Sequence, residues 1–404
     1  MATETAQTPA PSWQDTRKPF WPLALGVPLL PFLGFLVWQG TDGSWWAWWL
    51  APVIVFGVIP AVDLLIGDNR DNPPDEEFSR LQGEGYYRWL TYLYLPLQYL
   101  GLLVGCWVWV NGDLSLAGAA GLIATLAVVN GIAINTAHEL GHKRENVERW
   151  LSKIALAPTG YGHFYVEHNR GHHTRVATPE DPASSRLGES FWAFWPRTVI
   201  GSLRSAWRLE TSRFRIRGRS PWTPRNDVLN AWAMTVLLFA ALAVFFGPGV
   251  LPFLLLQGIF GFSLLEVVNY LEHYGLCRQR NAAGRYEKVD PRHSWNSDRT
   301  VTNVFLFQLQ RHSDHHANPL RRYQTLRSFD FSPQLPAGYA SMIVLALVTP
   351  LWRRVMDPRV VAHYEGDLAL ANVSPRALPG LRRRFAATGQ SPTAQGTAGG
   401  APAT

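Results

Sequence analysis

Eight of the twelve histidines in this chain lie in three short clusters whose spacing suits metal binding. The clusters are HELGH (138–142), HNRGHH (168–173) and HSDHH (312–316). Residues three and four apart on a helix share one face, so each cluster can direct two or three imidazoles toward a common point. Imidazole is a good ligand for iron, copper, nickel and zinc. The pattern therefore predicts a metal site built from His138, His142, His168, His172, His173, His312, His315 and His316.

A ninth candidate ligand, His273, lies in the segment NYLEHYGL (269–276), directly after a long apolar run. A structural zinc ion takes four ligands, so nine imidazoles indicate two metal ions. Three further histidines, His163, His293 and His363, stand alone in the sequence and are expected to be structural. Four acids adjoin the candidate ligands and are expected either to orient imidazole N–H groups or to pair with nearby arginines. They are Glu139, Glu167, Glu272 and Asp314.

Two other interpretations of these histidines are open to test. Residues 138–142 also match H-E-x-x-H, the zinc protease signature in which the glutamate acts as general base. That interpretation gives no role to the other seven candidate histidines. A metal transporter would need ligands at mid-membrane depth, whereas these histidines gather at one end of the apolar runs.

Six apolar runs are long enough to cross a bilayer, which takes about 20 residues in a helix. They cover residues 20–39, 45–65, 89–110, 116–137, 229–246 and 250–270, and none contains Lys or Arg. The fold class predicted is therefore an all-α membrane protein with six transmembrane helices and a cytosolic helical cap that carries the metal site. The apolar stretch 339–351 is too short to span.

The distribution of basic residues predicts the orientation. The links 41–44, 111–115 and 247–249 contain no Lys or Arg, so all basic residues lie in the other segments. By the positive-inside rule those segments are cytosolic, and six spans then place both termini in the cytoplasm. The net charge of +7 follows from this asymmetry, and no nucleic-acid-binding motif accompanies it. Two cysteines cannot form a disulfide framework or a four-cysteine iron–sulfur centre within the chain.

Three regions follow from composition. Residues 1–19 are expected to be a disordered N-terminal segment, because they offer little to bury. Residues 20–365 form the membrane domain with its cap. Residues 366–404 form a C-terminal tail, with the composition of a flexible linker from about residue 387. The long insert 143–227 includes an amphipathic stretch at 191–208 that fits either a helix in the headgroup plane or a packed cytosolic helix.

The segments HELGHK (138–143), EHNRGHH (167–173), NYLEHYGL (269–276) and LQRHSDHH (309–316) together resemble the integral-membrane alkane monooxygenases. These are non-haem di-iron enzymes related to membrane fatty-acid desaturases and xylene monooxygenases. The resemblance covers residues 20–365. It implies two iron ions, a bacterial inner membrane, and hydroxylation of medium-chain n-alkanes to primary alcohols with O2. A fatty-acyl desaturase or hydroxylase with the same histidine boxes is the alternative.

An alkane offers no polar group, so the protein must recognise it by apolar burial, worth about 0.8 kcal/mol per CH2. We therefore expect an apolar slot below the metals.

The electron source must lie outside this chain, because it has neither a G-x-G-x-x-G motif for a dinucleotide nor a cysteine quartet. The resemblance implies rubredoxin, reduced in turn by a flavin-dependent reductase. Rubredoxin is acidic, so basic cytosolic residues are expected to attract it. The linker-like tail adds the hypothesis of a rubredoxin fused after residue 404. The basic residues are Arg213, Arg215, Arg217, Arg219, Arg321, Arg322, Arg353 and Arg354.

Overall fold

Six long apolar helices form the body of the protein in the computed structural model, which describes residues 13–386. Their apolar side chains suit lipid, and their backbone groups are bonded within each helix, as a bilayer requires. The spans are Lys18–Gly40 (η1, Lys18–Leu25; α1, Gly26–Gly40), Trp45–Ile66 (η2, Trp45–Trp49; α2, Leu50–Val53; η3, Ile54–Val58; α3, Ile59–Ile66), Gly85–Asn111 (α5), Leu116–Gly141 (α6), Asp227–Phe246 (α11) and Pro248–Glu272 (η7, Pro248–Val250; α12, Leu251–Glu272). The predicted number and order of the spans are confirmed.

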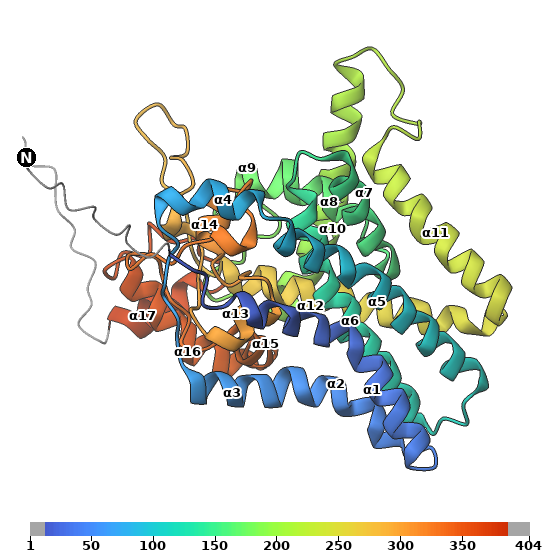
Figure 1. The fold of residues 1–404 in the computed structure, drawn as a ribbon. Helices are drawn as coiled ribbons and strands as arrows, with labels where there is room; N and C mark the ends of the chain where they lie inside the picture. The colour runs from blue at the N-terminus through green and yellow to red at the C-terminus, as the bar shows by residue number, and fades with distance from the viewer. Residues whose placement is uncertain (1–12, 387–404) are drawn as a thin grey trace, which may run out of the picture.

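Shorter helices gather at one end of the spans and form the cap (Figure 1). Residues 13–386 contain isolated β-bridges but no β-strand, so the all-helical prediction is confirmed for them. The cap elements are η4 (Asp75–Glu77), α4 (Phe78–Gly83), α7 (Asn146–Leu156), η5 (Ala157–Thr159), α8 (Phe164–Val166), η6 (Glu167–His172), α9 (His173–Arg175), α10 (Phe191–Arg215), η8 (Pro291–His293), α13 (Thr300–Phe305), α14 (His312–Ala317), η9 (Tyr323–Thr325), α15 (Tyr339–Leu347), α16 (Thr349–His363) and α17 (Leu378–Ala386).

Helix α6 lies at the centre of the bundle. In its most apolar 18-residue stretch 67% of the residues are buried, whereas in the corresponding stretch of α11 only 17% are buried. Helix α6 packs closely along α12: a Cβ at Gly131 would lie 2.7 Å from the carbonyl oxygen of Gly261. Such small residues let membrane helices approach closely. Because α6 ends in the first histidine cluster, the best-packed helix of the bundle positions the first two candidate ligands.

A buried amide network joins three spans to the insert. Gln98 Nε2 donates to Asn130 Oδ1 at 3.1 Å, and Asn130 Nδ2 donates to Gln257 Oε1 at 2.8 Å. Gln98 Nε2 also donates to the carbonyl oxygen of Ala155 at 3.1 Å, and Gln257 Nε2 donates to that of Pro158 at 2.6 Å. Polar groups in a bilayer core must find partners within the protein. The network therefore fixes the α7–η5 region against α5, α6 and α12.

The amphipathic stretch 191–208 belongs to α10, a 25-residue helix that packs on α12, α11 and the second histidine cluster. Phe191 and Phe194 are buried, whereas Trp192 and Ile200 are exposed. The helix thus has a packed face and an exposed apolar face.

Both terminal regions contain structured residues. Residues 13–19, part of the segment expected to be disordered, are held by Asp15, which accepts hydrogen bonds from Trp21 Nε1 at 2.8 Å and Tyr87 Oη at 2.9 Å. These buried partners compensate for the ordering of the chain. In the tail, Leu381 and Phe385 of α17 are buried against the cap. The expected disorder of residues 1–12 and the linker from 387 lie outside the described residues.

Candidate metal centre

All nine candidate histidines meet at the cap end of the spans and form two separate groups. His138 and His142 come from the end of α6, and His273 follows α12. The others come from η6, α9 and α14. Within each group one nitrogen of every ring lies within 4.8 Å of all the others. The first group is His138, His142, His168, His173 and His315; the second is His172, His273, His312 and His316.

The second cluster divides between the groups because of its backbone. Residues Glu167–His172 form a π-helical turn, a wider turn that occurs most often at functional sites. It brings His168 and His173, five residues apart, together with 3.0 Å between their Nε2 atoms. His172 turns to the second group, with its Nε2 3.2 Å from that of His316. The third cluster divides as well, although α14 is α-helical: His315 joins the first group, and His312 and His316 join the second. The expectation that each cluster aims at one point was therefore wrong for both clusters.

The arrangement of nitrogens fits bound cations. His316 Nε2 lies 2.8 Å from His312 Nε2, and His315 Nε2 lies 3.2 Å from His173 Nε2. The Nε2 atoms of His138, His142 and His273 are buried without a hydrogen-bond partner. A buried polar atom left without a partner costs free energy. A metal ion in each group would satisfy these converging lone pairs.

Burial also keeps the imidazoles in the form that binds metal. It lowers the pKa of His168 and His173 well below the usual value, and neighbouring imidazoles add to the effect. Burial likewise lowers the pKa of His273 to about 3. A neutral imidazole presents the free lone pair that a metal ligand needs. These residues are therefore ready to coordinate at neutral pH.

Two contacts at Nδ1, the nitrogen that faces away from the group, orient the rings of His172 and His273. His172 Nδ1 lies 2.8 Å from Asp181 Oδ2, and His273 Nδ1 lies 3.2 Å from the carbonyl oxygen of His293. Burial alone would raise the pKa of Asp181, but the electrostatic attraction of His172 and the hydrogen bonds from His172 and Ser184 bring it down to about 2. Asp181 therefore stays ionised and fixes His172 with Nε2 toward the group.

Three of the four acids expected to orient imidazoles pair with basic residues. Glu139 Oε1 accepts from Lys143 Nζ at 2.9 Å, and Glu167 Oε1 accepts from Arg175 at 2.6 Å. Asp314 accepts from Arg321 at 2.6 Å. Buried carboxylates need such partners, and these cations lie close in sequence. The expected contacts with imidazoles were wrong for Glu139, Glu167 and Asp314, and the open alternative of an ion pair holds.

Glu272 does contact a candidate ligand, although from the metal-facing side. Its Oε2 lies 3.1 Å from His312 Nε2, the same nitrogen that faces His316. Its other oxygen, Oε1, is buried without a hydrogen-bond partner. The isolated histidines His163 and His363 belong to neither group.

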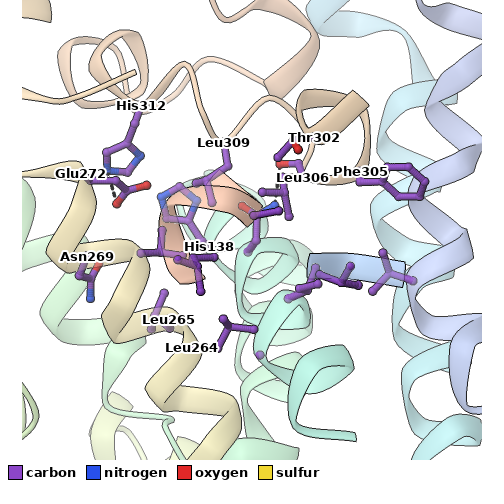
Figure 2. Close-up of a pocket in the computed structure, with 18 of the residues that line it drawn as sticks. His138, Leu264, Leu265, Asn269, Glu272, Thr302, Phe305, Leu306, Leu309 and His312 are labelled. Carbon is purple, nitrogen blue, oxygen red and sulfur yellow. Dashed lines mark hydrogen bonds and ion pairs between the residues drawn. The ribbon is translucent and has the colours of Figure 1, made fainter. Parts of the chain in front are cut away.

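An apolar cavity of about 790 Å³ adjoins the histidines. His138, His168 and His312 line it, and Figure 2 shows Leu264 and Leu265 on the side away from His312. Spans 1 and 2, α6, α12, α13 and α15 supply most of the remaining lining, with Phe164 of α8 and Leu306 and Leu309 after α13, and these residues are mostly apolar. A cavity with such an apolar lining suits a small apolar ligand. The apolar slot expected next to the candidate metal site is therefore present.

Similar proteins place the chain in a family. The fatty acid desaturase family model matches residues 114–346. Alkane 1-monooxygenases from Acinetobacter baylyi and Pseudomonas putida are each 46% identical, over 337 and 362 residues, which cover 83% and 89% of both chains respectively. A xylene/toluene monooxygenase hydroxylase component from Pseudomonas putida is 26% identical over 344 residues, 81% of this chain and 88% of its own.

Six spans and two histidine groups thus define a multi-pass membrane enzyme of the fatty acid desaturase family. Within it, the chain belongs to the alkane 1-monooxygenase family, as the sequence motifs predicted. The zinc protease interpretation fails, because Glu139 is bound to Lys143 and the first group joins five imidazoles.

Proposed function

We propose that this chain hydroxylates the terminal carbon of medium-chain n-alkanes with O2 at two iron ions, one in each histidine group. The observation that carries the proposal is the apolar cavity whose wall includes imidazoles of both groups, His168 of the first and His312 of the second. When bound, the iron ions would supply the activation of O2. The names of the relatives at 46% identity support the same reaction and substrate class.

In this proposal, residues of the chain bind the alkane and orient it toward the histidines. Apolar side chains of the cavity bind the alkane by removing its surface from water, at about 0.8 kcal/mol per CH2. Because the histidines lie at one end, the alkane can enter only with one terminus toward them, which favours attack at the terminal carbon. The same apolar lining excludes bulk water from the reacting end. Asn269 and Glu272 are polar lining residues near that end.

Electrons are supplied by rubredoxin in this proposal, with a flavin-dependent reductase upstream. His142 and His173 are half-buried and do not line the cavity, so the first group reaches the outer surface on another side. That surface offers a point for electron entry. Two residues expected to attract the carrier are already engaged: Arg321 pairs with Asp314, and Arg322 pairs with Glu148 at 2.9 Å. Arg213 likewise pairs with a buried acid, Glu210.

The reaction is tested with purified, iron-loaded protein, rubredoxin, its reductase, NADH and O2. Octane should yield 1-octanol, measured by gas chromatography. Turnover of acyl-CoA without any alkane product would contradict the proposal and favour the desaturase alternative.

The same assay tests the cavity through Leu264, which lies against Gly131 where α6 and α12 meet. Leu264→Phe should shift the preference to shorter alkanes, with about 0.8 kcal/mol of binding lost for each CH2 excluded. Leu264→Ala should shift it to longer ones. Leu255→Phe on the exposed, lipid-facing side of α12 is the control and should leave the profile unchanged. An identical chain-length profile in all three variants would show that the alkane lies elsewhere.

We also propose that the protein lies in a bacterial inner membrane with both termini and the histidine groups on the cytoplasmic side. The support is the absence of Lys and Arg from residues 41–44, 111–115 and 247–249, which join the opposite ends of the spans. A reporter fused at Pro248 should be periplasmic, and one at Arg217 cytoplasmic. The reverse pattern would rule out a soluble cytoplasmic electron donor.

A further inference from the structure

A second cleft, of about 830 Å³, lies between α10 and the loop that follows the second histidine cluster. Gly201, Ser205 and Ser212 of α10 form part of its wall. Four arginines also line it: Arg175, Arg186, Arg197 and Arg208. This cleft is separate from the apolar cavity and shares no lining residue with it.

Two of the four arginines are neutralised by acids. Arg175 donates to Glu167 at 2.6 Å, and Arg197 donates to Glu189 at 2.8 Å. In the described part of the chain, no acid lies within ion-pair distance of Arg186 or Arg208.

The two acids that line the cleft are engaged as well. Glu180 accepts from Arg280 at 2.8 Å, and Asp181 contacts His172 and Ser184. His172, as a candidate metal ligand, is neutral, so the ionised Asp181 offsets one of the two unpaired arginines, and the cleft carries a net charge of about +1. In addition, Arg175 Nε is buried without a hydrogen-bond partner. An anionic oxygen in the cleft would satisfy this donor, and guanidinium groups bind phosphate well.

The position of α10 places the cleft at the membrane boundary. Thr198 Oγ1 donates to Glu266 Oε2 of α12 at 2.8 Å, about two turns before that span ends. Glu210 accepts from the backbone N–H of Asp227, the first residue of α11, at 2.9 Å. Helix α10 therefore runs between the cap ends of the fifth and sixth spans, and its cleft lies at the level expected for lipid headgroups.

An apolar side chain continues the site toward lipid. Ile200, next to Gly201 of the cleft wall, is 48% exposed and packs in no core cluster. Aliphatic residues on an interfacial helix face acyl chains at the headgroup boundary. An anion that binds in the cleft and also carries acyl chains would contact both features.

We propose that this cleft binds the headgroup phosphate of an anionic phospholipid, with Arg186 and Arg208 as the principal cationic ligands. Basic pockets between membrane helices bind such headgroups. The bound lipid would brace α10 against the loop that carries Asp181, whose carboxylate orients His172. This role does not depend on the reaction proposed above.

The test reconstitutes the whole chain in nanodiscs of phosphatidylcholine, with and without phosphatidylglycerol. Retained lipid is measured by native mass spectrometry and thermal stability by light scattering. The natural chain should retain phosphatidylglycerol and melt at a higher temperature in its presence. An R186Q/R208Q double variant should bind it roughly 30-fold more weakly.

The matched control is R215Q/R217Q, which removes the same charge from exposed arginines near the tip of the α10–α11 connection, outside the cleft. It should retain phosphatidylglycerol like the natural chain. Equal melting temperatures of the two variants in phosphatidylcholine alone establish that both fold. An equal loss of lipid in both variants would overturn the proposal, because it would show non-specific attraction.

Two further measurements distinguish a lipid site from a site for soluble anions and from a site for an acidic protein. Inorganic phosphate or glycerophosphate that raises the melting temperature of the natural chain as much as the lipid does would identify a site for soluble anions and overturn the lipid assignment. A double variant with unchanged lipid binding but a raised KM for rubredoxin would identify the cleft as a protein-docking site and also overturn it.

Discussion

Replacing His273 with alanine is expected to lower the iron content from about two ions per chain to about one and to abolish hydroxylation. His273 is one of only four imidazoles in the second group, and its Nε2 is a buried atom whose lone pair has no protein partner. Its loss leaves three imidazoles there. Iron is measured by inductively coupled plasma mass spectrometry on purified protein.

His142→Ala tests the other group in the same way. The first group has five imidazoles, so four remain after the substitution. We therefore expect a weaker effect on iron content than for His273→Ala, with the loss appearing first when a chelator competes. The different outcomes of the two variants would establish that the histidines form two sites.

His163→Ala is the matched control, because His163 is also buried and neither ring nitrogen has a hydrogen-bond partner. It lies outside both groups and packs edge to face against Tyr161, with ring centroids 4.4 Å apart. Its loss should lower thermal stability and leave iron unchanged. If His163→Ala removed iron as His273→Ala does, the loss would reflect unfolding, and the assignment of ligands would fail.

The sequence alone was sufficient for the spans and the histidines, for physical reasons. A bilayer requires long runs of apolar helix, so the third span was predicted as 89–110 and found at Gly85–Asn111. The nine histidines that converge could be picked out because histidine is rare in this chain and eight of them each lie within a few residues of another in the sequence. The division into two groups was beyond the sequence. It depends on the π-helical turn at Glu167–His172, which no residue pattern indicated, and on the position of α14, whose histidines contribute to both groups.

The contacts around the ligands were also beyond the sequence. Asp181 lies nine residues after His172 in an irregular loop, and only the folded loop brings the two together. Conversely, Glu139 adjoins His138 in sequence, but successive residues on a helix point in different directions. Its carboxylate therefore reaches Lys143, one helical turn on, and the backbone N–H of Tyr323 at 3.3 Å. Adjacency in sequence was a poor guide to contact.

Asp181→Ala is expected to weaken iron binding in the second group by about 10- to 100-fold, although Asp181 is not proposed as a ligand. The carboxylate fixes the ring of His172 by contact with Nδ1, which leaves Nε2 directed at His316. Without it, the ring is free to rotate and to change tautomer. Asp181→Asn should show an intermediate loss, because an amide oxygen still accepts from Nδ1 but lacks the charge.

Glu180→Ala is the control for this series, since Glu180 precedes Asp181 in the same loop and binds Arg280 at the surface. Iron affinity is measured by competition with a chelator, and the melting temperature of the iron-free protein separates folding from binding. The order expected is Ala weakest, then Asn, then the natural chain and Glu180→Ala together. Equal iron affinity in Asp181→Ala and Glu180→Ala would show that the remaining packing around His172, and not the carboxylate, sets the orientation of its ring.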